Sequence, residues 1–171
     1  ADSTPGTLKL FQANLLSPGS FDQAMQGCEI VFHMASPFVV TNYKDAVKDI
    51  IEPAVLGTEN VLNSVNQTES VKRVIVTSSI ASTYGDAIDI LQTENNSFDE
   101  SHWNTTSSAT HQPYPYSKVM AERKAWEMAE AQDRWDLVCI NPALVFGQSL
   151  TPNTQSGSVE VLQQFANGMT L

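Results

Sequence analysis

A tyrosine and a lysine four residues apart, Tyr114 and Lys118, are the side chains best suited to chemistry in this chain. They stand at the start of a run, 117–131, that the sequence predicts to be helical, and helix residues four apart share a face. A nearby ammonium group favours the phenolate, so we expect it to lower the tyrosine pKa from its ordinary value of about 10. Such a pair can move the proton that accompanies hydride transfer at a carbonyl or alcohol. The same spacing is common on solvated helix faces, so the pair alone does not decide the function.

Hydroxyl side chains follow a predicted buried strand over residues 71–77. Positions 74–76 are β-branched and apolar, and Thr77, Ser78 and Ser79 come at the point where the strand should leave the sheet. In open α/β sheets, ligands bind at the edge formed by the carboxyl ends of the strands. A serine at that edge could hold a substrate oxygen beside a tyrosine acid, although serines at strand ends are also ordinary caps.

The composition is typical of a globular protein with a single core. The chain has 171 residues, of which 42% are hydrophobic and 16% charged, and its net charge is −10. That charge argues against nucleic acid or an anionic membrane as a partner. No apolar run approaches the roughly 20 residues that span a bilayer, and no signal peptide is recognisable at the start. We expect a cytoplasmic protein, with Cys28 and Cys139 as buried free thiols and with no metal site.

Segments typical of strands and of helices alternate along the chain. Strands are predicted over 7–12, 29–34, 71–77 and 137–141, and helices over 20–26, 45–67, 117–131 and 159–167. Pro53 is expected to bend the second helix. Strands separated by helices imply βαβ units and a mostly parallel sheet, so the predicted fold class is α/β. A long polar stretch over 86–113 is of a length that is usually functional or disordered.

Seven short motifs follow one another along nearly the whole chain. They lie at 18–22, 27–37, 57–62, 76–79, 99–103, 114–122 with 125–126, and 141–147. In this order they resemble the extended short-chain dehydrogenase/reductase family. The branch they resemble holds the dihydroflavonol reductases, the cinnamoyl-CoA reductases and the yeast-type aldehyde and ketone reductases. The resemblance implies a Rossmann-type doubly wound parallel sheet. It also implies NADP, with NAD as the alternative, and reduction of an aldehyde or ketone or the reverse oxidation of an alcohol.

The resemblance also implies roles for individual residues. Tyr114 corresponds to the acid/base, Lys118 to its tuner and a donor to the nicotinamide ribose, and Ser79 to the donor that holds the substrate oxygen. Ser78 is the runner-up for Ser79, and Tyr116 lacks the spacing to the lysine. The cofactor would also contact Asn14, Leu15, Ala35, Ser36, Pro37, Thr77, Pro142, Ala143 and Val145, and the substrate would contact Phe38, Ser79 and Tyr84. The two aromatic residues in that set could equally anchor loops.

Two other branches of the family compete with the carbonyl reductases. Sugar-nucleotide dehydratases carry an acidic pair directly after the corresponding hydroxyl, whereas Ile80 and Ala81 follow Ser79 here. That difference argues against dehydration. Tyr84 and Gly85 resemble the sugar-nucleotide epimerases, which therefore stand as an alternative enzyme class.

The chain has no Gly-x-x-Gly-x-x-Gly motif, the turn with which the family begins, and its first predicted strand corresponds to the family's third. Residues 1–150 are therefore expected to form a partial NAD(P)-binding domain without the first βαβ unit. Residues 151–171 would begin a substrate-binding lobe that is mostly absent. Such a fragment should bind the cofactor poorly, and its strand at 29–34 should be an exposed apolar edge. The non-enzymatic alternative is a truncated remnant that associates with a full-length paralogue. Helices 45–67 and 115–131 would form that contact or a dimer.

Overall fold

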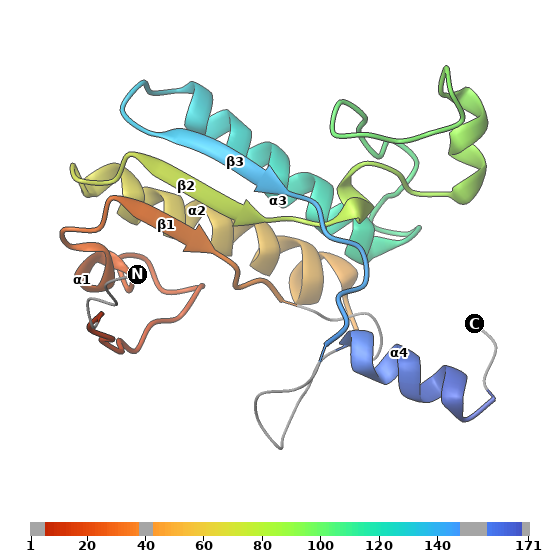
Figure 1. The fold of residues 1–171 in the computed structure, drawn as a ribbon, viewed down its shortest axis with the longest axis horizontal. Helices are drawn as coiled ribbons and strands as arrows, with labels where there is room; N and C mark the ends of the chain where they lie inside the picture. The colour runs from red at the N-terminus through yellow and green to blue at the C-terminus, as the bar shows by residue number, and fades with distance from the viewer. Residues whose placement is uncertain (1–5, 38–42, 148–156, 169–171) are drawn as a thin grey trace, which may run out of the picture.

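A three-stranded parallel sheet forms the centre of the structure, a computed structural model that describes residues 6–37, 43–147 and 157–168 (Figure 1). The strands are β1 (Ile30–His33), β2 (Arg73–Thr77) and β3 (Asp136–Ile140), in the spatial order β1-β2-β3. Phe32 pairs with Ile75, and Ile75 pairs with Val138. The carboxyl ends of all three strands therefore meet at one edge, as the α/β prediction requires.

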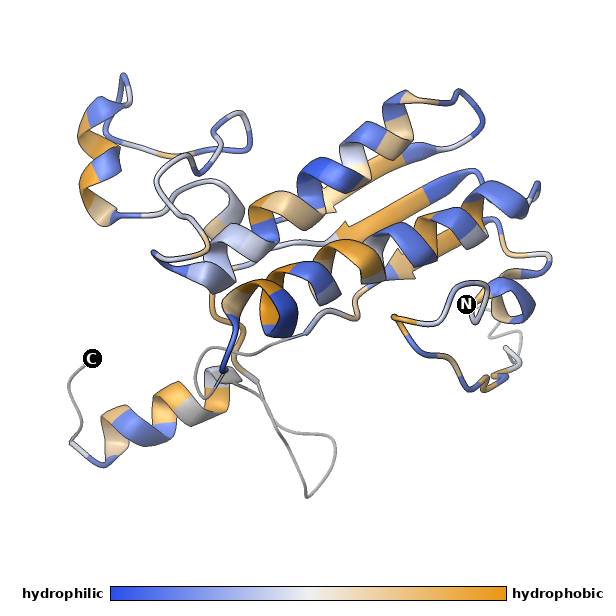
Figure 2. Cartoon of the chain, turned by 180° about the vertical axis from the view of Figure 1, so that it is seen from behind, coloured by the Kyte–Doolittle hydropathy of each residue, from blue (hydrophilic) through white to orange (hydrophobic). Residues whose placement is uncertain are grey.

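Two long helices, α2 (Glu52–Gln67) and α3 (Pro113–Glu130), cover one face of this sheet (Figures 1 and 2). Two shorter helices, α1 (Asp22–Met25) and α4 (Gly157–Ala166), lie outside this layer, and α4 stands apart from the sheet. The core lies between the sheet and the helices and contains Met25, Val61, Leu62, Val65, Val71, Val74, Val76, Ala125, Trp135 and Leu137. Along β2 and α2, these residues follow the periods of two and 3.6 that bury one face.

The helix predicted over 45–67 is divided in two. Residues Val47–Ile51 form a π-helical turn, η1, in which the Glu52 N–H donates to the Val47 carbonyl, and α2 then begins at Glu52. Pro53 has no N–H, so the regular hydrogen-bond ladder cannot run through it. The irregularity expected at Pro53 is thus a π-helical turn directly before the proline.

The strand predicted over 7–12 is wrong. These residues have no regular structure, and Leu8 and Leu10 are 84% and 88% exposed. A single strand is not stable without a neighbour to accept and donate its backbone hydrogen bonds. Among the described residues, the sheet consists of β1, β2 and β3 alone, and this segment pairs with none of them.

The exposed edge predicted for β1 is confirmed. Within the described residues its outer side is unpaired, and Phe32 is 66% exposed on the face that α2 and α3 do not cover. Ile30, Val138 and Ile140 are exposed on the same face. A doubly wound sheet would carry helices on both faces, so half of that arrangement is missing from this part of the chain.

The polar stretch over 86–113 contains one short 3₁₀ helix, η3 (Ala87–Gln92), and ends at Pro113, the first residue of α3. The rest is a loop that folds back on η2 (Ile80–Ser82). Asn104 attaches it: its backbone N–H donates to the Ser82 carbonyl and its side-chain amide donates to the Ala81 carbonyl, both at 2.8 Å. A Cβ atom at Gly85 would lie 2.7 Å from Asn104 Oδ1, so this close approach requires a glycine. In the described parts of the chain, no helix is long and apolar enough to cross a membrane.

Candidate active site

Tyr114, Ser79 and Lys118 meet at the carboxyl edge of the sheet. Tyr114 lies in the first turn of α3, directly after Pro113, and Ser79 lies after β2 as the N-cap residue of η2. A hydrogen bond joins the Ser79 and Tyr114 side chains. The Lys118 ammonium lies 5.6 Å from the centre of the Tyr114 ring. The helix, the strand end and the four-residue spacing therefore bring together the three residues that the sequence singles out.

The pKa of Tyr114 differs from the expectation. The sequence predicts a value lowered by Lys118, whereas burial raises the pKa above its ordinary value and the Ser79 hydrogen bond only partly offsets that rise. Burial disfavours the charged phenolate. The predicted lowering is therefore wrong, and Tyr114 is protonated at neutral pH.

Lys118 is buried against the end of β1. Only 7% of the residue is exposed, and its ammonium donates to Ser36 Oγ at 2.9 Å. Burial lowers the pKa of Lys118. His33, at the end of β1, has a pKa of about 4 because of burial and, second, the charge of Lys118. His33 is therefore neutral at pH 7, and Lys118 is the charged group at this edge.

Several of the expected cofactor residues gather around Lys118. Ala35, Ser36 and Thr77 line a small cavity of about 20 Å³ together with Lys118. Pro142 follows β3, and its carbonyl accepts a hydrogen bond from the Ile80 N–H at 3.0 Å. Ala35 to Pro37, Thr77 and Pro142 thus follow three neighbouring strands at one edge. Ala143 and Val145 continue from β3 as exposed residues, and Pro37 is half-buried.

Asn14 and Leu15 lie elsewhere. Leu15 packs against α2, where a Cβ atom at Gly57 would come within 3.3 Å of it, and its carbonyl accepts from the Asn60 side chain at 2.8 Å. The Asn14 side chain accepts from the nearby Leu16 N–H at 2.9 Å. In Figure 1 this N-terminal segment lies on the β1 side of the sheet, away from β3. The structure therefore does not bring this pair to the Tyr114 cluster.

The expected substrate residues are only partly placed. Tyr84 is half-buried and stacks on Phe98 with ring centres 4.9 Å apart, and Phe98 meets His102 edge-on. Tyr84 therefore anchors the loop over 86–113, which is the alternative role considered for it. Phe38 lies outside the described residues.

A buried carboxylate, Glu122, was not singled out from the sequence. Its Oε2 atom accepts hydrogen bonds from Ser78 Oγ at 2.5 Å, Ser82 Oγ at 2.6 Å and Asn141 Nδ2 at 2.9 Å. Ser78 is thereby engaged, which separates it from Ser79. The spacing holds a signal for this residue, because positions 114, 118 and 122 continue one stripe of the helix.

Among the described residues, neither a reactive cysteine nor a metal-binding cluster is found. Cys28 and Cys139 are free but half-buried, so the expectation of free thiols holds and that of full burial does not. Burial, and secondly Glu122, raises the pKa of Cys139 to about 12. A thiol with that pKa is a poor nucleophile at neutral pH. Within the described ranges no group of three or more His, Cys, Asp or Glu side chains could hold a metal ion.

The strand order and the Tyr114 cluster place the chain among Rossmann-type α/β proteins. Residues 1–170 match the NAD dependent epimerase/dehydratase family, and the chain belongs to that family. It is 39% identical over 170 residues to anthocyanidin reductase of Arabidopsis thaliana, covering 95% of this chain and 48% of the relative. It is 38% identical over 172 residues to cinnamoyl-CoA reductase of Medicago truncatula, covering 99% and 51%. The chain spans about half the length of the curated relatives it matches.

Solved structures agree with this assignment. The yeast methylglyoxal/isovaleraldehyde reductase Gre2, complexed with NADPH, superposes with a TM-score of 0.75 at 29% identity, covering 90% of this chain and 49% of Gre2. Vestitone reductase from alfalfa (Medicago sativa) gives a TM-score of 0.66 at 25% identity, covering 90% and 46%. The resemblance to the reductase branch and the predicted Rossmann-type fold are confirmed.

Proposed function

We propose that this chain is part of an NADPH-dependent reductase that converts an aldehyde or ketone to an alcohol, or catalyses the reverse oxidation. The observation that carries the proposal is the Ser79–Tyr114 hydrogen bond beside the buried Lys118 ammonium at the strand edge. The relatives point the same way, because those named above are reductases and one was solved with NADPH. An epimerase-like reaction is the alternative enzyme class, and no contact among the described residues favours it.

The chemistry divides between the cofactor and the chain. NADPH, when bound, supplies the hydride that reaches the carbonyl carbon. The Ser79 hydroxyl donates to the carbonyl oxygen and orients it. Tyr114, protonated at neutral pH because its pKa is raised, gives that oxygen its proton. Lys118 is a buried cation one helical turn from Tyr114 that stabilises negative charge left on the phenol oxygen.

The residues present fit the nicotinamide end of such a cofactor. Lys118 offers a buried ammonium to the ribose hydroxyls, and Ser36 shares a hydrogen bond with it. Ala35, Pro37, Thr77, Pro142, Ala143 and Val145 complete the proposed contact set, with Asn14 and Leu15 toward the adenine. The pyrophosphate usually rests on a glycine-rich turn at a helix N-terminus, and this sequence has no such motif. We therefore expect weak cofactor binding by the chain alone.

A second proposed function is association without catalysis, as a partner of a full-length paralogue. The bare face of the sheet supports it, because Phe32, Val138 and Ile140 are exposed there. A dimer through the layer formed by η1, α2 and α3 would instead bury Val47 of η1 and Leu56 of α2, which are 42% and 47% exposed. The two free cysteines support a cytoplasmic location, where thiols stay reduced.

The test is an NADPH titration of the purified chain, followed by nicotinamide fluorescence, and then a screen of aldehydes and ketones. Lys118→Ala should weaken binding about tenfold or more, since a buried charged contact is lost, while Lys72→Ala at the exposed end of the sheet should not. Tyr114→Phe should lower the reduction rate by about 10²- to 10⁴-fold, and Tyr116→Phe should leave it unchanged. Reduction that survives in Tyr114→Phe would exclude the proposed mechanism.

A further inference from the structure

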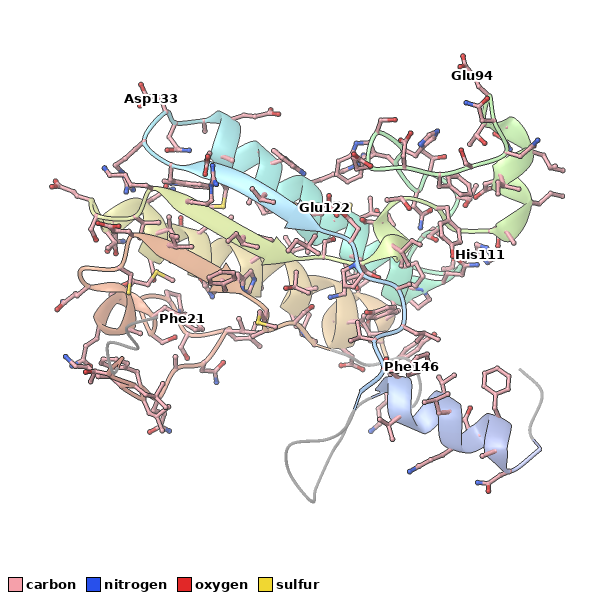
Figure 3. All side chains as sticks on the ribbon, in the orientation of Figure 1. Phe21, Glu94, His111, Glu122, Asp133 and Phe146 are labelled. Atoms are coloured by element: carbon pink, nitrogen blue, oxygen red, sulfur yellow. The ribbon has the colours of Figure 1, made fainter. Side chains whose placement is uncertain are left out.

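Glu122 is a carboxylate buried at the meeting point of three chain segments. It extends from α3 toward the ends of β2 and β3, and 7% of the residue is exposed (Figure 3). Its Oε2 atom accepts from Ser78, the last residue before Ser79, from Ser82 of η2, and from Asn141 after β3. One carboxylate oxygen therefore accepts hydrogen bonds from the residue after β2, from the last residue of η2 and from the residue after β3.

Two of these donors also hold Ser79. The Ser79 carbonyl accepts from Asn141 Nδ2 at 3.1 Å and also lies 2.7 Å from Ser82 Oγ, whose single proton is shared between this carbonyl and Glu122 Oε2. Asn141 and Ser82 are themselves 2.7 Å apart, from Nδ2 to Oγ. The backbone of Ser79 is thus fixed by side chains that the Glu122 carboxylate orients, and this backbone determines where the Ser79 hydroxyl lies.

We propose that Glu122 is a positioning residue that holds the Ser79 hydroxyl opposite the Tyr114 phenol. The proposal rests on the proposed reductase function and deepens it, because Ser79 would then be aligned with both the substrate oxygen and the proton donor. Without the carboxylate, three buried donors lose their shared acceptor and must turn to other partners. Ser79 would follow them and lose its hydrogen bond to Tyr114.

A purely structural role is the competing explanation. Glu122 Oε1 also lies 3.4 Å from Trp126 Nε1 on the same helix, so the carboxylate could serve only to join α3 to the sheet. The titratable groups that face the cluster among the described residues are Lys118 and Glu130 from α3, His33 from β1, Cys139 from β3 and Glu100 from the loop over 86–113. A structural role would change the stability of the chain and leave the Ser79–Tyr114 contact as it is.

Titration of the Tyr114 phenol separates the two explanations. The ultraviolet absorbance of the chain is followed with pH, and subtraction of the Tyr114→Phe variant isolates this one tyrosine. In Glu122→Gln we expect the Tyr114 pKa to rise by about half a pH unit or more, as in Ser79→Ala, because the Ser79 hydrogen bond lowers it. Removal of a negative charge by itself would lower the pKa, so the two effects have opposite signs.

A control variant and a double variant test whether the change in the Tyr114 pKa comes from the Ser79 contact. Glu130→Gln removes an exposed carboxylate from the same helix and should leave the titration unchanged. Ser79→Ala combined with Glu122→Gln should give no further rise, because both changes remove the same contact. A folded Glu122→Gln chain in which Tyr114 titrates at the original pH, or at a lower one, would overturn the proposal.

A second variant covers a failure of Glu122→Gln to fold. Asn141→Ala keeps the carboxylate and removes one bond to the Ser79 carbonyl, so it too should raise the Tyr114 pKa, and an unchanged value would again count against the proposal. The titration needs no turnover. If the chain binds no NADPH, the proposed function fails. The Tyr114 pKa still shows whether Glu122 positions Ser79.

Discussion

Two ionisable side chains, His33 and Lys118, are buried beside each other at the strand edge. His33 is 7% exposed and its Nε2 atom lies 3.5 Å from Thr58 Oγ1. Burial, and then the charge of Lys118, lowers its pKa to about 4 from the ordinary 6.5. The folded chain therefore binds fewer protons than the unfolded chain between these two values. The stability that neutral His33 contributes is fully present above pH 6.5 and is lost as the pH falls toward 4.

We predict a pH-dependent loss of stability that a His33→Gln variant lacks. From pH 7 to pH 5, this histidine should remove about 2 kcal/mol from the free energy of unfolding. Between the same two pH values, the free energy of unfolding of His33→Gln should fall by about 2 kcal/mol less than that of the original chain, because glutamine does not titrate. Urea unfolding at the two pH values measures the difference. His111→Gln, at a ring that is 53% exposed, is the control and should keep most of the loss. Equal losses in the original chain and His33→Gln would refute the assignment to His33.

At the scale of elements, an arginine from outside α2 closes the end of that helix. The Arg134 guanidinium lies in the turn between α3 and β3 and donates to the carbonyls of Val65, Asn66, Thr68 and Val71 at 2.6–3.2 Å. The last carbonyls of a helix have no partner within it. Arg134 supplies that partner and connects α2, the start of β2 and the turn before β3.

We predict that Arg134→Lys lowers the free energy of unfolding by about 2 kcal/mol. A lysine keeps the charge but cannot reach four carbonyls with a planar group, and hydrogen bonds from charged donors contribute about 1.5–3 kcal/mol each. Arg73→Lys is the matched control, since the Arg73–Asp136 pair is exposed and should matter little. Thermal unfolding of the two variants decides the point. Equal shifts would mean that Arg134 does not cap the helix.

At the scale of the whole molecule, α2 and α3 cover one face of the sheet, and no other element of the described ranges covers the second face, which is the bare face. The bare face exposes Ile30, Phe32, Val138 and Ile140, and the outer edge of β1 is unpaired within the described residues. A contiguous apolar surface beside an open strand edge favours association. The chain by itself should therefore associate at high concentration.

We predict that Phe32→Glu reduces this association. Phe32 is 66% exposed on the bare face, on the open edge strand β1, so a charge there should disrupt contacts between molecules while leaving the fold intact. Sedimentation at increasing concentration measures the effect. Leu91→Glu is the control, because Leu91 is 71% exposed but lies on η3, away from the sheet. A similar loss of association in both variants would show that general charge, rather than this face, is responsible.

Local patterns determined much of this architecture. The alternation of apolar runs predicts β1, β2 and β3 and the helices that follow them, because strand and helix periods depend on neighbours a few residues apart. The four-residue spacing of Tyr114 and Lys118 and the position of Ser79 after a strand predict their meeting for the same reason. Parallel strands bring their carboxyl ends to one edge whatever else the sheet contains.

Contacts between distant residues were decided only by the tertiary structure. The segment over 7–12 has a strand-like composition, yet it forms no strand, because pairing needs a neighbour that local sequence cannot supply. The pKa of Tyr114 is raised rather than lowered, because burial is a property of the assembled site and outweighs the lowering by the Ser79 hydrogen bond. Glu122 joins Ser78, Ser82 and Asn141 across 19 to 44 residues of chain. The sequence by itself thus determined which residues could do chemistry, and the packing of α3 on the sheet decided their protonation and alignment.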